Sequence, residues 1–207
     1  MTPYSRLMNE FLTIEKPATA EYKDRGSKFL AYAWPINDKD SFKKYLAAVK
    51  KAHPKASHHC FAYRIGTDGN NYRVSDDGEP SGTAGRPILG QIDSKELTNV
   101  LIIVVRYFGG TLLGIPGLIQ AYKSAAAAAL EQATIIEKPV LLHYRLQFDY
   151  TQMNEVMKLV KQYDVHIQKQ EMALYCTMQL GIPKINAETV KFRLEELNGV
   201  ELLQLAD

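Results

Sequence analysis

Residues 100–117 have the sequence VLIIVVRYFGGTLLGIPG, which decides the fold of the first two thirds of the chain. Val100–Tyr107 is an unbroken run rich in β-branched side chains, so it predicts a strand buried on both faces of a sheet. Four glycines follow, between Gly109 and Gly117. After them, the alanine-rich segment 121–133 predicts a helix of small residues that can pack closely against that strand.

The segments before residue 100 predict further strands and one helix. Strands are expected at Thr19–Tyr22 and Lys28–Pro35, and a helix at Ser41–Lys51 with its first residue as N-cap. His59–Ile65 and Tyr72–Val74 indicate a hairpin around a glycine-rich turn. Alternate side chains of the second strand should lie on opposite faces of a sheet. The two sets are Phe29, Ala31 and Ala33 against Leu30, Tyr32 and Trp34.

The last third of the chain predicts a second, smaller domain. A strand begins at Leu142, and an amphipathic helix with Thr151 as candidate N-cap follows. Two more alternating runs, a helix capped by Asn186 and a final strand complete the order βαββαβ. This order is that of the ferredoxin-like fold. We expect the boundary near Glu137-Lys138-Pro139, which gives domains at residues 1–136 and 140–207.

The composition excludes several protein classes. Of 207 residues, 46% are hydrophobic and 23% charged, which is typical of globular proteins rather than collagen, coiled coil or disordered chains. The longest apolar run, Val100–Val105, is far short of the roughly 20 residues of a membrane helix, and no signal-peptide pattern is present. Two cysteines, Cys60 and Cys176, lack the spacing of a disulfide scaffold or a zinc site. We therefore expect a cytoplasmic protein with no membrane contact.

The charge is balanced overall but unevenly distributed. The formal net charge is +2. Residues 1–136 hold 17 Lys and Arg against 13 Asp and Glu, whereas residues 137–207 hold 8 against 10. This mild basic excess permits nucleic-acid binding but does not by itself establish it.

An acidic segment, SDDGEPSGTAG at residues 75–85, is the first candidate site. Its carboxylates, Asp76, Asp77 and Glu79, are close enough to repel one another, so they should bind a cation or accept backbone hydrogen bonds in a tight turn. The spacing of a calcium loop is absent, and magnesium would need help from a bound phosphate. The turn is the favoured hypothesis, and no metal is assigned. The residues of this segment that define its motif are Asp76, Asp77, Gly78, Glu79, Gly82, Thr83 and Gly85.

The glycine-rich segment is the second candidate site. Its glycines are Gly109, Gly110, Gly114 and Gly117, and they precede a helix, so backbone N–H groups could face an anion. The sequence matches neither the P-loop nor the dinucleotide-binding motif. A sharp turn that needs positive φ explains the glycines equally well.

Basic and aromatic residues flank both segments, in a pattern that suits phosphate pairing and base stacking. Neighbours in a strand point to opposite faces, however, so solvated arginines beside core tyrosines remain an alternative. His58 and Cys60 share a face of their strand, but the sequence predicts neither a metal site nor a covalent nucleophile there. The flanking residues are Arg64, Arg73, Arg86 and Arg106, with Tyr63, Tyr72 and Tyr107.

Together, the two segments and their flanks carry a specific family resemblance. Asp76–Gly85, Asn99-Val100, Val104–Thr111 and Ala121-Tyr122 resemble the signature of the IMPACT family, in its bacterial YigZ type. The resemblance extends upstream through His59–Arg64 and covers nearly the whole chain. It implies a left-handed βαβ domain, also found in elongation factor G, a ribosomal protein and small-molecule kinases. The ferredoxin-like tail would resemble another elongation-factor domain.

The family also implies a function. Eukaryotic relatives regulate translation by competing for the scaffold that activates an amino-acid-starvation kinase, and bacterial members are assigned to nucleic-acid or ribosome binding. No catalytic activity and no cofactor come with the resemblance.

The chain departs from the family pattern within the glycine-rich segment. The family usually has KLGVGGLVR where this chain has LLGIPGLIQ at residues 112–120. Leu112 and Gln120 thus replace two cations, which weakens the case for RNA binding. Pro116 replaces a glycine, so Gly114 and Gly117 are expected to supply any positive φ.

We therefore expect an α+β protein with a left-handed βαβ domain and a ferredoxin-like domain. Its leading function is translation-related regulation through RNA or ribosome binding, with no catalytic residue. One alternative is a protein-interaction module for a translation factor or scaffold. The other is a magnesium-dependent enzyme acting on a phosphorylated small molecule, with the acidic segment as metal ligand. The residues expected to contact nucleic acid are Arg64, Arg73, Arg86, Arg106 and Tyr107.

Overall fold

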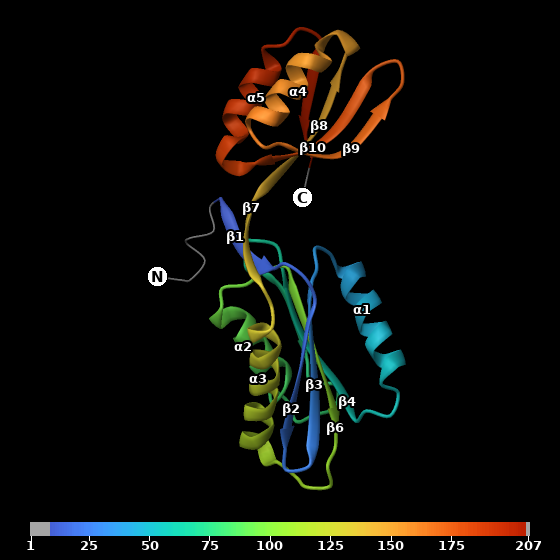
Figure 1. The fold of residues 1–207 in the computed structure, drawn as a ribbon, viewed down its shortest axis with the longest axis vertical. Helices are drawn as coiled ribbons and strands as arrows, with labels where there is room; N and C mark the ends of the chain where they lie inside the picture. Colours follow the sequence, from blue (N-terminus) through green and yellow to red (C-terminus); the bar gives the residue numbers. More distant parts are fainter. Residues whose placement is uncertain (1–8, 206–207) are drawn as a thin grey trace. The chain divides into compact units, whose positions relative to one another are not determined.

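The structure is a computed structural model that describes residues 9–205 (Figure 1). These residues form two compact units, residues 11–138 and residues 139–205 with 9 and 10. Both units combine strands with helices, which confirms the predicted α+β class.

The N-terminal unit is built on a five-stranded sheet whose neighbouring strands are all antiparallel. Its order is β2-β3-β6-β4-β5. The central strand β6 is buried from Val100 to Arg106, as its unbroken apolar run predicts. A separate two-stranded sheet pairs β1 (Glu10–Ile14) with β7 (Ile135–Pro139). The strands of the main sheet are β2 (Ala18–Asp24), β3 (Ser27–Pro35), β4 (His58–Ile65), β5 (Asn71–Ser75) and β6 (Val100–Tyr107).

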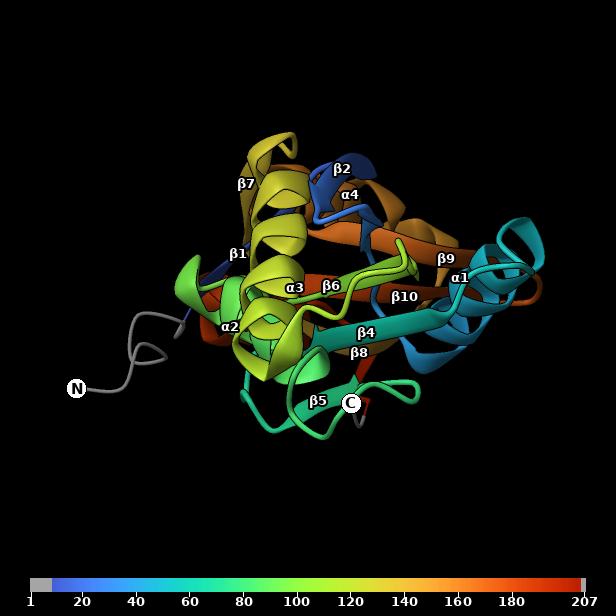
Figure 2. The same ribbon diagram turned by 90° about the horizontal axis from the view of Figure 1, so that it is seen from below.

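Helices cover both faces of this sheet. Figures 1 and 2 show α1 (Lys39–Ala52) on one side and α2 (Gly85–Ser94) with α3 (Gly114–Glu131) on the other. The alternation predicted in β3 is confirmed, because Phe29 lies in the core under α2 and α3 while Tyr32 packs against the core under α1. Small residues at the contact, Ala121 and Ala125 among them, let α3 approach the sheet.

Two crossover connections in this sheet have opposite hand. Strands β3 and β4 both run antiparallel to β6 and are therefore parallel to each other, with α1 between them in the chain. Strands β5 and β6 are parallel for the same reason, with α2 between them. The strands of the first connection run opposite to those of the second, and the two connections also cross the sheet in opposite directions. These two reversals cancel, so the connections would have the same hand if their helices lay on one face. Their helices cover opposite faces, however. One of the two is therefore left-handed, although about 98% of such crossovers are right-handed.

The C-terminal unit has the predicted ferredoxin-like topology. Its antiparallel sheet has the order β11-β8-β10-β9, in which the first and third strands of the βαββαβ unit lie at the centre. Val156 of one helix and Val190 of the other are buried in a core with Leu146 and Met178 of the sheet. The elements are β8 (Leu141–Phe148), α4 (Met153–Gln162), β9 (His166–Met172), β10 (Cys176–Pro183), α5 (Ala187–Glu195) and β11 (Val200–Gln204).

Two predicted N-caps are wrong, and the third stands at the predicted position without a capping hydrogen bond. The side chain of Asp38, not Ser41, caps α1, because its Oδ1 accepts the backbone N–H of Ser41 at 2.6 Å. Asp149 takes the role expected of Thr151 in the turn before α4 and accepts that residue's N–H at 2.9 Å. Asn186 precedes α5 but makes no capping hydrogen bond.

The start of α3 is also earlier than predicted. The helix begins at Gly114, so Pro116 lies in its first turn rather than in a loop. A proline is acceptable there, because the first N–H groups of a helix have no partner within it and the fixed φ of proline suits the helix. The glycine-rich segment is consequently half loop and half helix.

Candidate functional site

The acidic segment forms a turn whose first carboxylate caps α2. Asp76 accepts the backbone N–H groups of Gly82, Ala84 and Gly85 at 2.8–3.0 Å. Burial alone would raise the pKa of Asp76, but these hydrogen bonds and the charge of Arg86 together hold it below its usual value. The carboxylate thus lies at the N-terminus of α2, where an external anion would otherwise bind.

The other two carboxylates of the segment have different partners. Asp77 accepts the backbone N–H of His59 at 2.7 Å, and its second oxygen lies 3.6 Å from the ammonium group of Lys50. Glu79 is buried, and its Oε1 accepts hydrogen bonds from Arg106 and Tyr122, both at 2.7 Å. Within residues 9–205, no three His, Cys, Asp or Glu side chains are placed to hold a metal ion together. The carboxylates are therefore used to stabilise the turn and the sheet beneath it.

A buried polar cluster lies under this turn. The Sγ atom of Cys60 is 3.0 Å from the carbonyl oxygen of Asp76 and 3.3 Å from the hydroxyl oxygen of Tyr122. Burial raises the pKa of the Cys60 thiol and of the Tyr122 hydroxyl far above their ordinary values. Both groups stay protonated at neutral pH, so the geometry gives Cys60 no thiolate character.

The glycine-rich segment is held tightly against the β2–β3 turn. A Cβ atom on Gly109 would lie 1.9 Å from the carbonyl carbon of Gly26, so only glycine fits there. The backbone N–H of Gly109 also donates to Ser27 Oγ at 3.2 Å. Positive φ occurs at Gly110 (85°) and Gly114 (69°), whereas the expectation for Gly117 is wrong. Close approach and turn geometry together explain the glycines.

The four predicted arginines do not form one surface. Arg64 and Arg106 are each only 5% exposed and point to the face covered by α2 and α3. Arg73 is exposed, with its guanidinium 5.9 Å from the ring centroid of Phe61 in the opposite core, and Arg86 is exposed on α2. The structure thus scatters the four arginines, and their predicted contact with nucleic acid stays a prediction. Two of the arginines are buried in ion pairs, and strand alternation places a third on the other face.

Tyr107 lies on the face opposite to Arg106. Its hydroxyl is 2.9 Å from Nδ1 of His53, whose Nε2 is 2.8 Å from the hydroxyl of Tyr32. Burial, followed by the nearby charges of His59 and Lys28, lowers the pKa of His53. The half-buried ring of Tyr107 thus packs edge-on against a histidine and does not join the arginines.

Sequence reasoning missed a set of exposed apolar side chains, here called the exposed apolar segment. From Leu112 onward these residues are spaced three and four positions apart, which is the spacing of one side of a helix. This pattern could have indicated the segment from the sequence. Ile115 and Ile119 also have the helical spacing of the buried Leu118 and Tyr122, so the sequence alone suggested that all of them face the core. Its members are Phe108 (49% exposed), Leu112 (83%), Ile115 (58%) and Ile119 (38%).

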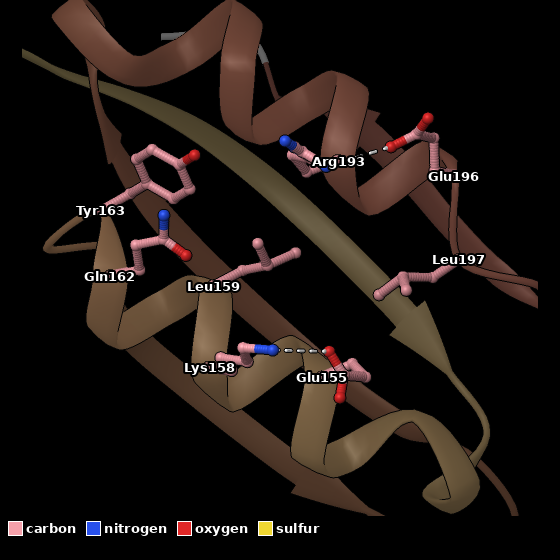
Figure 3. A pocket seen from close by; sticks show the side chains of 8 residues that line it. All are labelled: Glu155, Lys158, Leu159, Gln162, Tyr163, Arg193, Glu196 and Leu197. Carbon is pink, nitrogen blue, oxygen red and sulfur yellow. Dashed lines mark ion pairs between the residues drawn. The ribbon is translucent and has the colours of Figure 1, made fainter.

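The C-terminal unit has a groove of about 250 Å³ beside α4 and α5. Figure 3 shows the ion pair Lys158–Glu155 on α4 and the pair of Arg193 on α5 with Glu196 just after it, with two leucines between them. The charged side chains are thus paired with residues three positions away in the chain, at 3.6 and 3.8 Å. The residues that line the groove are Glu155, Lys158, Leu159, Gln162, Tyr163, Arg193, Glu196 and Leu197.

Membrane insertion through a helix finds no support in the part of the chain described. None of the helices within residues 9–205 combines the length and the apolar character that a membrane span requires.

Comparisons with known proteins identify close relatives. The family model of the Impact N-terminal domain matches residues 25–130. An IMPACT family member of Haemophilus influenzae is 32% identical over 97% of this chain and 100% of its own length. The IMPACT family member YigZ of Escherichia coli is 31% identical over 96% and 98%. A crystal structure described as that of a hypothetical protein has a TM-score of 0.76 at 31% identity, covering 97% of this chain and 100% of its own.

Proposed function

The chain belongs to the IMPACT family, and on this premise we propose that it is a translation-related regulatory protein that acts by binding another protein. The partner would be a translation factor or a scaffold of the translation apparatus, and such a role would place the chain in the cytoplasm. The proposal combines the family's implied role in translation with the surface that this chain offers.

One observation carries the choice of a protein partner, namely the exposed apolar segment. Large apolar side chains that are exposed near one another are typical of interaction sites rather than of inert surface. Ile115 and Ile119 are four residues apart on α3 and so lie on one side of the helix, with Leu112 just before its first turn. The loop that carries Phe108 and Leu112 is fixed by the contact of Gly109 with Gly26. A preorganised apolar surface loses little conformational entropy on binding.

A second candidate is RNA or ribosome binding, favoured by the exposed cations Arg73 and Arg86 and by the basic excess of residues 1–136. Arg64 and Arg106 do not support it, because their guanidinium groups are buried against carboxylates. The enzyme alternative is not favoured, because the Asp76 oxygens and Glu79 Oε1 already accept hydrogen bonds from the protein.

A reconstituted bacterial translation reaction tests the proposal. We expect the purified chain to change the rate of protein synthesis, and Leu112→Asp with Ile115→Asp to abolish that effect at an unchanged melting temperature. Leu174→Asp is the matched control, because Leu174 is 81% exposed in the C-terminal unit. Arg73→Gln with Arg86→Gln should leave the effect intact.

Two outcomes would contradict protein binding through this segment. No change in synthesis at a molar excess of chain over ribosomes would remove the regulatory role. If Arg73→Gln with Arg86→Gln abolishes the effect and Leu112→Asp with Ile115→Asp does not, RNA or ribosome binding replaces protein binding as the proposed function. In that case Leu112→Lys with Gln120→Arg, which restores the family cations, should strengthen the effect at low salt.

A further inference from the structure

Two arginines of the N-terminal sheet are equally buried but differently satisfied. Nε and Nη2 of Arg64 both donate to Oδ1 of Asp93, at 3.1 and 2.7 Å. Arg106 uses Nη1 for Glu79, at 2.7 Å, while the one described acceptor of its Nη2 is Ser27 Oγ at 3.4 Å. Its Nε is fully buried and has no hydrogen-bond partner among residues 9–205. The edge formed by Nε and Nη2 is thus filled in one arginine and open in the other.

The open edge has a defined chemistry. Nε–H and Nη2–H of a guanidinium point in parallel and match the two oxygens of one carboxylate. Leaving a buried charged donor unsatisfied costs free energy, so such donors are rare in folded proteins. At Arg64, where the ion pair is purely structural, a carboxylate of the same chain, that of Asp93, fills this edge. The edge of Arg106 therefore points to an acceptor from outside the chain.

One of the two aromatic rings beside Arg106 is partly exposed to solvent. Its guanidinium carbon lies 5.6 Å from the ring centroid of Phe108 and 5.5 Å from that of the buried Phe29. Phe108 is itself half-exposed and belongs to the exposed apolar segment. Rotation of one partly solvated ring is thus a short route from solvent to the guanidinium.

We propose that the Nε–Nη2 edge of Arg106 binds a carboxylate from an acidic side chain of the partner protein, with Phe108 moving aside. The apolar residues beside that carboxylate would pack on the exposed apolar segment. Glu79, Asp76 and Asp77 lie in the neighbouring turn, so a phosphate dianion would be repelled more strongly than a carboxylate. This inference rests on the proposed function and names the chemistry of its partner.

Nuclear magnetic resonance of the 15N-labelled chain tests the site without a partner. We expect sodium acetate to shift the Nε–H signal of Arg106 saturably in the millimolar range, because Glu79 already balances most of its charge. The Nε–H signal of Arg64 is the internal control and should not move. Sodium chloride at equal ionic strength, neutral acetamide and inorganic phosphate should each shift the Arg106 signal less than acetate does.

A peptide pair tests the link to the apolar segment. Acetyl-Leu-Asp-Leu-Leu-amide should bind at least tenfold more tightly than acetate, and the Asn version of the peptide should lose that gain. Phe108→Ala should strengthen acetate binding, because the covering ring is gone, but weaken peptide binding. If Phe108 had only a structural role, Phe108→Ala would not change the affinities for acetate and for the peptide in opposite directions.

Several results would overturn the inference. If acetate moves the Arg106 signal no more than chloride does, a buried water fills the edge instead. If acetate binds but the peptide gains nothing, the site takes a small carboxylate rather than a protein partner. Both measurements use the isolated chain, so their failure leaves the translation assay of the proposed function standing.

Discussion

The acidic segment and the glycine-rich segment both contain residues typical of ligand binding, yet the structure uses them in opposite ways. The acidic segment satisfies its charges internally, through the cap on α2 and the ion pair of Glu79 with Arg106. The glycine-rich segment packs Gly109 against the backbone of Gly26 and leaves large apolar side chains in solvent. The difference shows that charged residues in a sequence need not be exposed in the folded protein. Leu112 and Ile115, the large side chains that the glycine-rich segment exposes, are apolar.

The largest effect is expected from Glu79→Ala. This substitution leaves the buried guanidinium of Arg106 without its partner and removes an acceptor of Tyr122. We expect a loss of about 3–5 kcal/mol in the free energy of unfolding, measured by urea denaturation. Glu79→Gln keeps an oxygen acceptor and should lose less. A loss below about 1 kcal/mol for the alanine variant would mean that the acidic segment does not stabilise the fold.

The next effect tests the packing of the glycine-rich segment. Gly109→Ala places a methyl group where Gly26 already lies and should cost about 3 kcal/mol of stability. Gly110→Ala is the matched control, since a Cβ there meets nothing within 4 Å and only the positive φ is strained. It should cost about 1 kcal/mol. Equal losses in thermal unfolding would show that close approach is not what requires glycine at residue 109.

Asp76 gives a smaller effect that depends on pH. Asp76→Ala should cost about 2 kcal/mol at neutral pH, because three backbone N–H groups lose their acceptor. The pKa of Asp76 is lowered in the folded state, so its contribution is complete above the ordinary pKa of aspartate. It disappears as the pH falls through the lower, folded-state value. The difference in unfolding free energy between wild type and variant should therefore shrink on acidification, and a difference that is constant from pH 7 to pH 2 would contradict the capping role.

The smallest effect on stability is expected from the exposed apolar segment. Leu112→Asp with Ile115→Asp should change the free energy of unfolding by less than about 0.5 kcal/mol per substitution, because neither side chain is buried. The same pair should abolish the effect on translation. A marked loss of stability, seen as a lower melting temperature, would instead assign these side chains to the folded core.

Local patterns in the sequence predicted most of the fold. The unbroken run of β6 correctly indicated burial on both faces, and the order βαββαβ correctly indicated the topology of the C-terminal unit. The predicted cap of α1 was wrong because Asp38, three residues before Ser41, also has a side-chain oxygen that can accept a backbone N–H. The start of α3 failed because Gly114 and Pro116 suggest a loop unless the first turn of a helix is recognised as tolerating them.

The candidate site was predictable only in part. Two segments of unusual composition could be located, and the glycines and carboxylates in them do hold the turns together. The partners of the arginines could not be predicted, because Asp93 and Glu79 lie 29 and 27 residues away from Arg64 and Arg106. The exposure of Leu112 and Ile115 was equally hidden, since both continue the helical spacing of the buried Leu118 and Tyr122.

The sequence alone indicated most strands and helices, although not β1, β7 or the first turns of α3, since hydrophobic periodicity and turn residues act over a few neighbouring positions. It also determined the family, through motifs that cover both segments. The tertiary structure decided which charges are neutralised and which apolar side chains stay in solvent. Those outcomes depend on long-range contacts, because a buried arginine takes whatever carboxylate the fold brings within hydrogen-bonding distance. For Arg64 that carboxylate is Asp93, and for the Nε–Nη2 edge of Arg106 the described residues supply none.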